Sequence, residues 1–235
     1  MRYHSLDWVG YQECVARHNI KRAIGLVKLV STRYYIGMST ENLYNLAERL
    51  GELLRVERRG MLRARQLEPV HLATLRYLCT CNQFSNTASA ITEYLGQTKG
   101  TTSQTLKVLE KKSLLERVAD VKDRRVVHFF VSPTGRRLVS EVAPSLALMD
   151  ACARVEPSDQ VAAEQVLADL ITALLQTNNM RAFGICGRCR HNQRRQTGLT
   201  KGTSFCNLVK QELSASDNQL ICREYQRVDV AAGLG

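Results

Sequence analysis

The carboxyl-terminal quarter of the chain contains four cysteines whose spacing is typical of a metal site. Within FGICGRCRHNQRRQTG (183–198) two cysteines are separated by two residues, and two more follow, giving the pattern C-x2-C-x16-C-x15-C. Two thiolates on one turn can bind the same ion, and four within about forty residues can complete its coordination. The predicted metal ligands are Cys186, Cys189, Cys206 and Cys222.

The identity of the metal stays open between zinc and an iron–sulfur cluster. Zinc is the common occupant of four-cysteine sites, but the missing second C-x2-C pair counts against an ordinary zinc ribbon. A cluster tolerates scattered ligands and would make the chain responsive to redox state, oxygen or iron supply. A reversible disulfide pair is a third alternative. His191 could replace one sulfur, although a histidine that faces solvent or phosphate is the preferred interpretation.

The overall composition favours a polyanionic partner. The chain has 235 residues, a formal net charge of +11 and 44% hydrophobic residues. Nucleic acid is the first expected partner of so basic a chain, and an acidic membrane surface is the second. No run approaches the roughly 20 apolar residues of a membrane span, and the first residues lack a signal-peptide pattern. We therefore expect a cytoplasmic protein, in which eight cysteines favour metal or redox chemistry over structural disulfides.

The segment that precedes the metal pattern is predicted to be mainly helical. Residues 1–38 form an extension of uncertain status, with Met38 as an alternative start. A helix is expected over 39–66 with Ser39 or Thr40 as its cap. Its leucines follow three- and four-residue steps, which is typical of a helix that pairs with another chain. This seam consists of Leu43, Leu46, Leu50 and Leu53.

The next motifs predict a helix-turn-helix followed by a wing. Helices are expected over 67–81 and 85–96, and a third begins near Thr98 with a Thr-, Ser-, Gln- and Lys-rich face. Two β-prone runs, 115–119 and 126–131, then flank the polar hairpin 120–125.

Two further helices are expected before the cysteine-rich tail. One begins near Thr134 and continues through Cys152, and the other begins at Pro157. The second carries an apolar stripe at helical spacing that includes Leu167, Leu170, Ile171, Leu174 and Leu175. Cys79 and Cys152 are interpreted as buried free thiols.

The order of these motifs resembles that of the MarR family of bacterial winged-helix transcription regulators. The most specific stretch is DVKDRRVVHFFVSPTGRRLV (120–139), and TKGTTSQTLKVLEKKSLLER (98–117) is similar to the family's recognition helix and its exit. The resemblance covers about 140 residues, 40–178, and excludes both ends of the chain. It implies a mainly α fold with a small β wing, non-enzymatic action, and repression from a pseudo-palindromic operator.

The resemblance also implies which residues contact double-stranded DNA. Lys or Gln side chains of the recognition helix would read bases in the major groove, while a wing arginine, oriented by an aspartate, would enter the minor groove. The implied DNA-binding residues are Thr98, Lys99, Thr101, Thr102, Ser103, Gln104, Lys107, Asp123, Arg124 and Arg125. One departure is Ser113, where the family often has a glycine that suits a left-handed helix end.

The resulting domain prediction runs from an uncertain extension to a metal-binding tail. After residues 1–38 it places a dimerisation helix (39–66), a winged helix-turn-helix (67–140), carboxyl-terminal dimerisation helices (141–179) and a basic four-cysteine tail (180–235). The family implies a homodimer, with a small molecule or a redox change as effector. Two other functions stay open: a metal-dependent redox protein or enzyme that docks through its winged helix, and an architectural DNA-binding protein that senses nothing.

Overall fold

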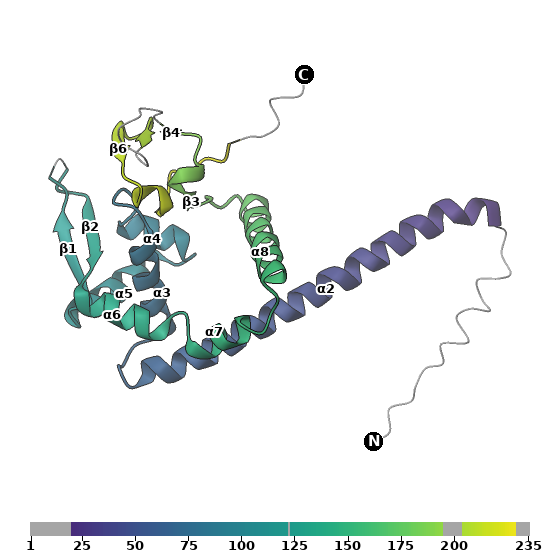
Figure 1. Cartoon of the computed structure of the whole chain (residues 1–235), viewed down its shortest axis with the longest axis horizontal. Helices are drawn as coiled ribbons and strands as arrows, with labels where there is room; N and C mark the ends of the chain where they lie inside the picture. Colours follow the sequence, from purple (N-terminus) through teal and green to yellow (C-terminus); the bar gives the residue numbers. More distant parts are fainter. Residues whose placement is uncertain (1–19, 122, 195–203, 229–235) are drawn as a thin grey trace. The chain divides into compact units, whose positions relative to one another are not determined.

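The computed structural model describes residues 20–121, 123–194 and 204–228, with side chains from residue 40 onward and without that of Arg194 (Figure 1). The chain divides into two compact units, Met1–Glu57 and Arg58–Gly235. Helix α2 (Ile20–Arg63) provides most of the described part of the first unit. It begins 19 residues before the predicted cap at Ser39, because no proline interrupts residues 20–38 and both hydroxyl residues are tolerated inside a helix. The predicted helix start is therefore wrong.

Three helices precede the wing, and the last two form the predicted helix-turn-helix. They are α3 (Pro69–Thr80), α4 (Ala88–Tyr94) and α5 (Lys99–Lys111). The hydroxyl of Thr87 accepts a hydrogen bond from the backbone of Ala90 at the start of α4, and that of Thr98 accepts one from Thr101 at the start of α5. These two caps satisfy backbone N–H groups that the helices leave free, which fixes where each helix begins.

The predicted wing is a two-stranded antiparallel sheet. Strand β1 (Leu115–Ala119) pairs with β2 (Val127–Val131), so that Leu115 lies opposite Val131 and Ala119 opposite Val127. The inner side chains of both strands join one core with the three helices. This core includes Leu72, Leu75, Tyr77, Ile91, Leu106, Leu109, Leu115, Phe129, Val131 and Leu138.

The helix expected from Thr134 through Cys152 is two helices. Helix α6 (Pro133–Val142) ends before Pro144, and α7 (Leu146–Cys152) begins after it. Proline cannot donate the helical hydrogen bond, and it forces the preceding Ala143 into an extended backbone. Gly135 in α6 is required for close packing, since a Cβ atom there would lie 2.4 Å from the carbonyl oxygen of Leu114.

Helix α8 (Pro157–Thr177) confirms the last predicted helix, with Pro157 in its first turn. Cys152 is exposed, so the prediction of a buried thiol at that position is wrong. None of the helices that the structure describes is long and apolar enough to span a lipid bilayer.

The cysteine-rich tail folds into small sheets that the sequence did not predict. Strand β3 (Gly184–Ile185) pairs with β7 (Ile221–Cys222). Strands β4 (Asn192–Arg194), β5 (Ser204–Cys206) and β6 (Gln211–Leu213) form a second sheet, and two short 3-10 turns, η1 (Cys186–Arg188) and η2 (Asp217–Gln219), complete the tail.

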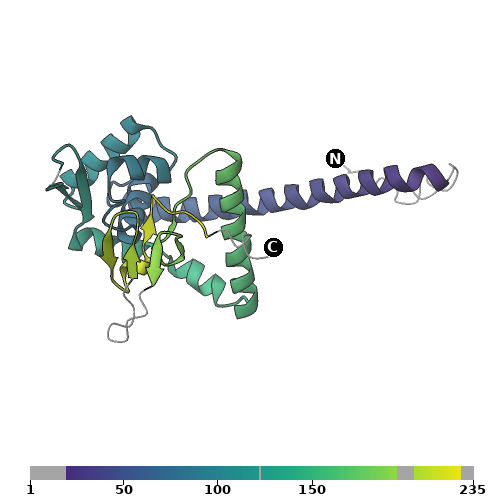
Figure 2. The same cartoon turned by 90° about the horizontal axis from the view of Figure 1, so that it is seen from above.

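The tail packs against the helix-turn-helix (Figure 2). The backbone of Asn82, between α3 and α4, donates a 2.9 Å hydrogen bond to the carbonyl of Ile221. The ring of Phe183 lies edge-on to Tyr77 and to Tyr94, with centroids 6.1 and 5.2 Å away. Apolar and backbone contacts therefore join segments that lie between 89 and 139 residues apart in the chain.

An ion pair reinforces this contact. The guanidinium of Arg223, which follows β7, donates two hydrogen bonds to the carboxylate of Glu93 on α4, one of them 2.8 Å long. Arg181 also lies 3.5 Å from that carboxylate. The hydrogen bonds from Arg223 lower the pKa of Glu93, and partial burial opposes them.

We predict that Ser113→Gly stabilises the protein. Ser113 follows α5 with a left-handed backbone (φ +55°), which costs a residue with a Cβ about 1–2 kcal/mol. Glycine removes this cost but adds freedom to the unfolded chain, so the free energy of unfolding should rise by about 0.5–1 kcal/mol. Urea unfolding followed by circular dichroism measures the change. Ser113→Ala, which keeps the Cβ, is the control, and an equal gain in both variants would contradict the explanation.

We predict that Glu93→Gln removes a pH-dependent contribution to stability. The pKa of Glu93 is lower in the folded protein, so its ionised form contributes stability above the unfolded value of about 4.3. This contribution is lost as the pH falls through the folded pKa. Unfolding midpoints of wild type and variant should therefore differ at pH 7 and converge as the pH falls through the folded pKa of Glu93. A difference that is constant with pH would show that the pair contributes nothing through charge.

Candidate nucleic-acid interface

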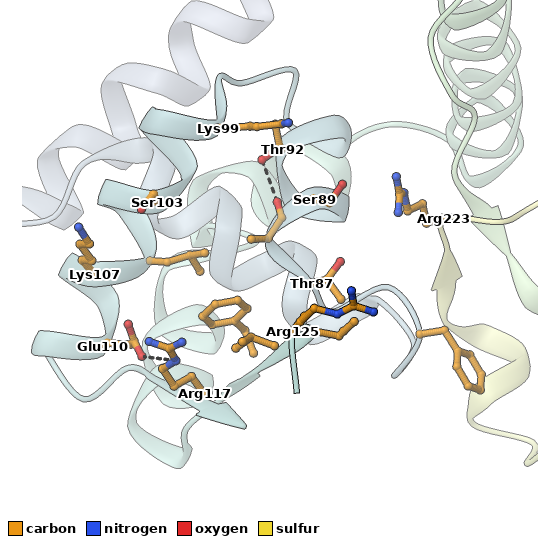
Figure 3. A pocket seen from close by; sticks show the side chains of 16 residues that line it. Thr87, Ser89, Thr92, Lys99, Ser103, Lys107, Glu110, Arg117, Arg125 and Arg223 are labelled. Atoms are coloured by element: carbon orange, nitrogen blue, oxygen red, sulfur yellow. Dashed lines mark hydrogen bonds and ion pairs between the residues drawn. The ribbon is translucent and has the colours of Figure 1, made fainter. Parts of the chain in front are cut away.

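One face of α5 presents polar side chains to an open groove. Lys99, Ser103 and Lys107 recur every four residues, which places them on one side of the helix. Together with α4 and the wing they line a groove of about 700 Å³ (Figure 3). Thr101 and Gln104 are exposed on the same helix but do not line this groove. The major part of the predicted recognition face is thus accessible to a ligand.

Two of the predicted contact residues have structural roles instead. Thr102 is buried, and its hydroxyl accepts a 2.9 Å hydrogen bond from Thr92, which fastens α5 to α4. The prediction that Thr102 lies on an exposed face is therefore wrong, because the packing of α4 covers that face. Thr98 is the cap of α5, and its hydroxyl is hydrogen-bonded to the backbone and the side chain of Thr101.

The wing tip holds an arginine in a fixed orientation. The carboxylate of Asp123 accepts two 3.0 Å hydrogen bonds from the guanidinium of Arg125, which is 91% exposed and lines the groove. These bonds lower the pKa of Asp123, so its charge persists in mild acid. Arg124 is exposed and has no polar partner within the described segments. The expected pairing of an aspartate with a wing arginine is present, and the arginine is Arg125.

A histidine that the sequence did not single out fixes the base of the wing. The ring of His128 on β2 is hydrogen-bonded to the side-chain oxygen of Asn86 and lies 3.2 Å from the carboxylate of Asp120. The backbone of Phe129 also donates a hydrogen bond to the carbonyl of Asn86. The wing is thereby joined to the residue that precedes the cap of α4.

The groove is lined by more cations than acids, although Asp123 and Glu93, which do not line it, pair with two of the cations. Among the described residues that line it, five are cationic and one is acidic. The acid, Glu110, lies 3.9 Å from Arg117, so it offsets only that cation (Figure 3). The remaining cations are Lys99, Lys107, Arg125 and Arg223. Such a surface attracts phosphate groups and releases their counterions. Arg223 was not predicted from the sequence as part of this surface, because it lies 98 residues beyond Arg125 in the chain.

The four predicted metal ligands lie around one cavity. Cys186 and Cys189 stand at η1, Cys206 ends β5 and Cys222 ends β7. All four line a narrow cavity of about 20 Å³. Nevertheless, no three His, Cys, Asp or Glu side chains within the described residues are grouped closely enough to hold a single metal ion.

Two of these thiols interact directly. The thiol of Cys186 hydrogen-bonds to Cys222 and lowers the pKa of Cys222, although burial opposes this effect. The same hydrogen bond, together with burial, raises the pKa of Cys186. The two shifts are therefore opposite in direction and have the same principal cause, the hydrogen bond between the two thiols.

His191 also lies against the cavity, contrary to the preferred interpretation of a solvent-facing ring. Its Nε2 atom is buried, and no group in the described part of the chain hydrogen-bonds to it. A buried ring nitrogen without a partner is costly and points to a missing ligand or neighbour.

The comparisons with known proteins find similarity over part of the chain. A MarR family model matches residues 65–126. No curated protein sequence matches the chain. The DNA complex of MepR from Staphylococcus aureus is 21% identical, covers 55% of this chain and 95% of that one, and has a TM-score of 0.46. The transcriptional regulator BldR from Sulfolobus solfataricus is 17% identical, covers 59% and 97%, and has a TM-score of 0.47.

The match begins just before α3 and ends at the wing tip, so it contains α4, α5 and β1, which build the groove. The tail with its four cysteines lies outside it. The fold is mainly helical with a small β wing, as predicted, and the part of it that matches the MarR family model is residues 65–126.

Proposed function

We propose that this chain is a dimeric transcription regulator that binds double-stranded DNA at a specific pseudo-palindromic sequence and represses the adjacent gene. The observation that carries the proposal is the basic groove between α5 and the wing, within a segment that matches the MarR family. The relative from Staphylococcus aureus was solved with DNA bound, which supports the same class of ligand for this chain.

The exposed residues of α5 suit the major groove. Gln104 can bond two atoms of an adenine, and Lys99 or Lys107 can reach guanine or phosphate. Thr102 is excluded from base contact because it is buried. Base reading is therefore assigned to Lys99, Ser103, Gln104 and Lys107, with Thr101 beside them.

The wing suits the minor groove. Arg125 is exposed and held by Asp123, so little side-chain entropy is lost when its guanidinium enters a narrow A·T-rich groove. Arg124 lies beside it with no partner in the described residues, and it can contact either the groove or a phosphate.

Two exposed apolar stripes support the dimer. On α2, Leu46 is 69% exposed and Leu53 52%, and on α8, Ile171 is 57% exposed and Leu174 53%. Leucine rows of this kind are normally buried against another surface. A second copy of the chain would cover them and place two recognition helices about 34 Å apart, one turn of DNA.

We predict that Arg125→Ala weakens DNA binding at least about tenfold, since a charge-assisted contact is worth about 1.5–3 kcal/mol. The double variant with Arg124→Ala should lose more and have a smaller salt dependence. Fluorescence anisotropy measures both, with a duplex that the wild type selects from a random-sequence pool. Arg154→Ala, an exposed arginine outside the groove, is the control and should bind normally. Unchanged affinity in the double variant would exclude the wing as a DNA contact.

We predict that Leu167→Asp combined with Ile171→Asp converts the protein to a monomer. Each aspartate would place a charge in the apolar contact between copies, where it would be desolvated without a partner. Light scattering coupled to gel filtration should report half the wild-type mass, and affinity for the selected duplex should fall. Ser158→Asp in the first turn of the same helix adds charge outside the stripe and should leave the mass unchanged. A wild type that is monomeric at micromolar concentration would refute the dimer.

A further inference from the structure

One cation of the groove between α5 and the wing comes from the cysteine-rich tail. Arg223 directly follows β7, and it lines the groove together with Ser89 of α4 and Lys99 of α5 (Figure 3). The family match ends at residue 126, so the matched segment does not include this side chain. The tail therefore adds a charged group to a surface whose other parts belong to the helices and the wing.

The backbone of the tail is attached to the helix-turn-helix on both sides of Cys222. The N–H of Arg223 donates a 2.9 Å hydrogen bond to the hydroxyl of Ser85, and the carbonyl of Ile221 accepts one of 2.9 Å from the N–H of Asn82. Ser85 and Asn82 are both buried. These bonds fix the segment from which Arg223 extends, and neither of them uses the Arg223 side chain.

The side chain of Arg223 is also fixed, and part of its guanidinium stays open. Its Nε and Nη2 atoms donate hydrogen bonds to the carboxylate of Glu93 on α4, that from Nε being 2.8 Å long. Its Nη1 atom has no hydrogen-bond partner among the residues that the structure describes. A guanidinium carries five N–H donors in a rigid fork, so a carboxylate on one edge leaves donors for a second acceptor. The side chain is 26% exposed, and a phosphate oxygen is a suitable acceptor there.

The position of Arg223 beside α4 favours the phosphate backbone of DNA over the bases. In a helix-turn-helix the second helix enters the major groove, while the first crosses the backbone. Here α5 is the second helix and α4 the first. Because Glu93 holds Arg223 against α4, its open donors belong with the element that crosses the backbone. Phosphate contacts of this kind orient a protein on the duplex but do not read its sequence.

The acid that holds Arg223 also has a second arginine beside it. Arg181 lies 3.5 Å from the carboxylate of Glu93, but it does not line the groove. Glu93 orients Arg223 before any ligand arrives, so little side-chain entropy is lost on binding. Arg181 shares the same acid without sharing the surface, which makes it a matched control.

We propose that Arg223 is a DNA phosphate contact that the cysteine-rich tail supplies beside α4. This inference rests on the proposed DNA-binding function and deepens it. The operator is then held by three separate elements, which are α5, the wing and the tail. The contribution of the tail strengthens binding to every sequence equally, whereas α5 supplies the preference for particular bases.

The first test is the salt dependence of binding by Arg223→Ala in the full chain. Affinity for the selected duplex should fall about fivefold to tenfold, since a charge-assisted contact is lost. The slope of log affinity against log salt should become smaller by about 0.9 for each bound copy, the value for one phosphate. Duplexes with single base changes should show the same relative loss. Fluorescence anisotropy over a series of salt concentrations measures all three.

Three further variants exclude other causes of the loss. Arg181→Ala should bind like the wild type, because that arginine lies outside the groove. The loss should persist when Arg223→Ala is compared with wild-type Arg223 in a Glu93→Gln background, where no uncompensated carboxylate remains. Arg223→Gln replaces the alanine variant if circular dichroism shows that the latter does not fold.

The second test locates the contact on the DNA. Single phosphates of the selected duplex are replaced in turn by neutral methylphosphonates. We expect one position in each half-site where the replacement weakens binding by the wild type but not by Arg223→Ala. Equal effects on both proteins at every position would refute the phosphate contact. So would unchanged affinity of Arg223→Ala, or a loss of affinity with an unchanged salt slope. A wild type that selects no duplex from the random pool would instead refute the proposed function.

Discussion

The burial of Tyr77 joins the helices before the wing to the cysteine-rich tail. Its ring is almost fully buried in the core, 4.5 Å from the ring of Tyr94 on α4 and 6.1 Å from that of Phe183 in the tail. Its hydroxyl donates a 2.8 Å hydrogen bond to the carbonyl of Ser85, in the turn before α4. Burial raises the pKa of this phenol, so the hydroxyl keeps its proton. One side chain thus fixes α3, α4 and the tail against each other, and α5 takes its position from α4.

Hydrogen bonds near Tyr77 also join the turn between α3 and α4 to the tail. Asn82 and Ser85, in the turn between α3 and α4, bond to the tail on one side and to the helix-turn-helix on the other. Separating the tail from the turn would leave the side chains of Asn82 and Ser85 and their tail partners without these hydrogen bonds, which is costly for buried polar groups. The tail therefore packs against the core of the winged helix, although the family match ends before it.

The cations of the groove belong to different elements and are held in place in different ways. The lysines of α5 are placed by helical spacing, Arg125 by its aspartate on the wing, and Arg223 by Glu93. A cation that is held by a neighbouring acid loses less freedom on binding phosphate than a free one. The groove thus combines adaptable lysines with two oriented arginines, and one of these arginines belongs to the segment that carries the cysteines.

The features that the sequence by itself determined depend on interactions between residues close together in the chain. The start of α5 near Thr98, the proline at the start of α8 and the wing strands depend on residues within a few positions of one another, and these were predicted correctly. Pro144 carried an equally local signal for the break between α6 and α7, and the prediction of one continuous helix overlooked it. The start of α2 was missed for another reason, because a possible cap at Ser39 does not compel a helix to begin there.

Only the tertiary structure decided the roles of residues whose partners are distant in the chain. Thr102 has the side chain of a DNA contact, yet the packing of α4 buries it against Thr92. Arg223 lines the groove and forms an ion pair with Glu93, which lies 130 positions away. His191 lines a cavity in the tail, whose short strands no periodic pattern predicts. The spacing of the four cysteines predicted a metal site, but it could not show whether their side chains meet at one point or only line one cavity. The physical reason is that the distances between them depend on how the tail closes on the winged helix, and no interaction within a few residues specifies that closure.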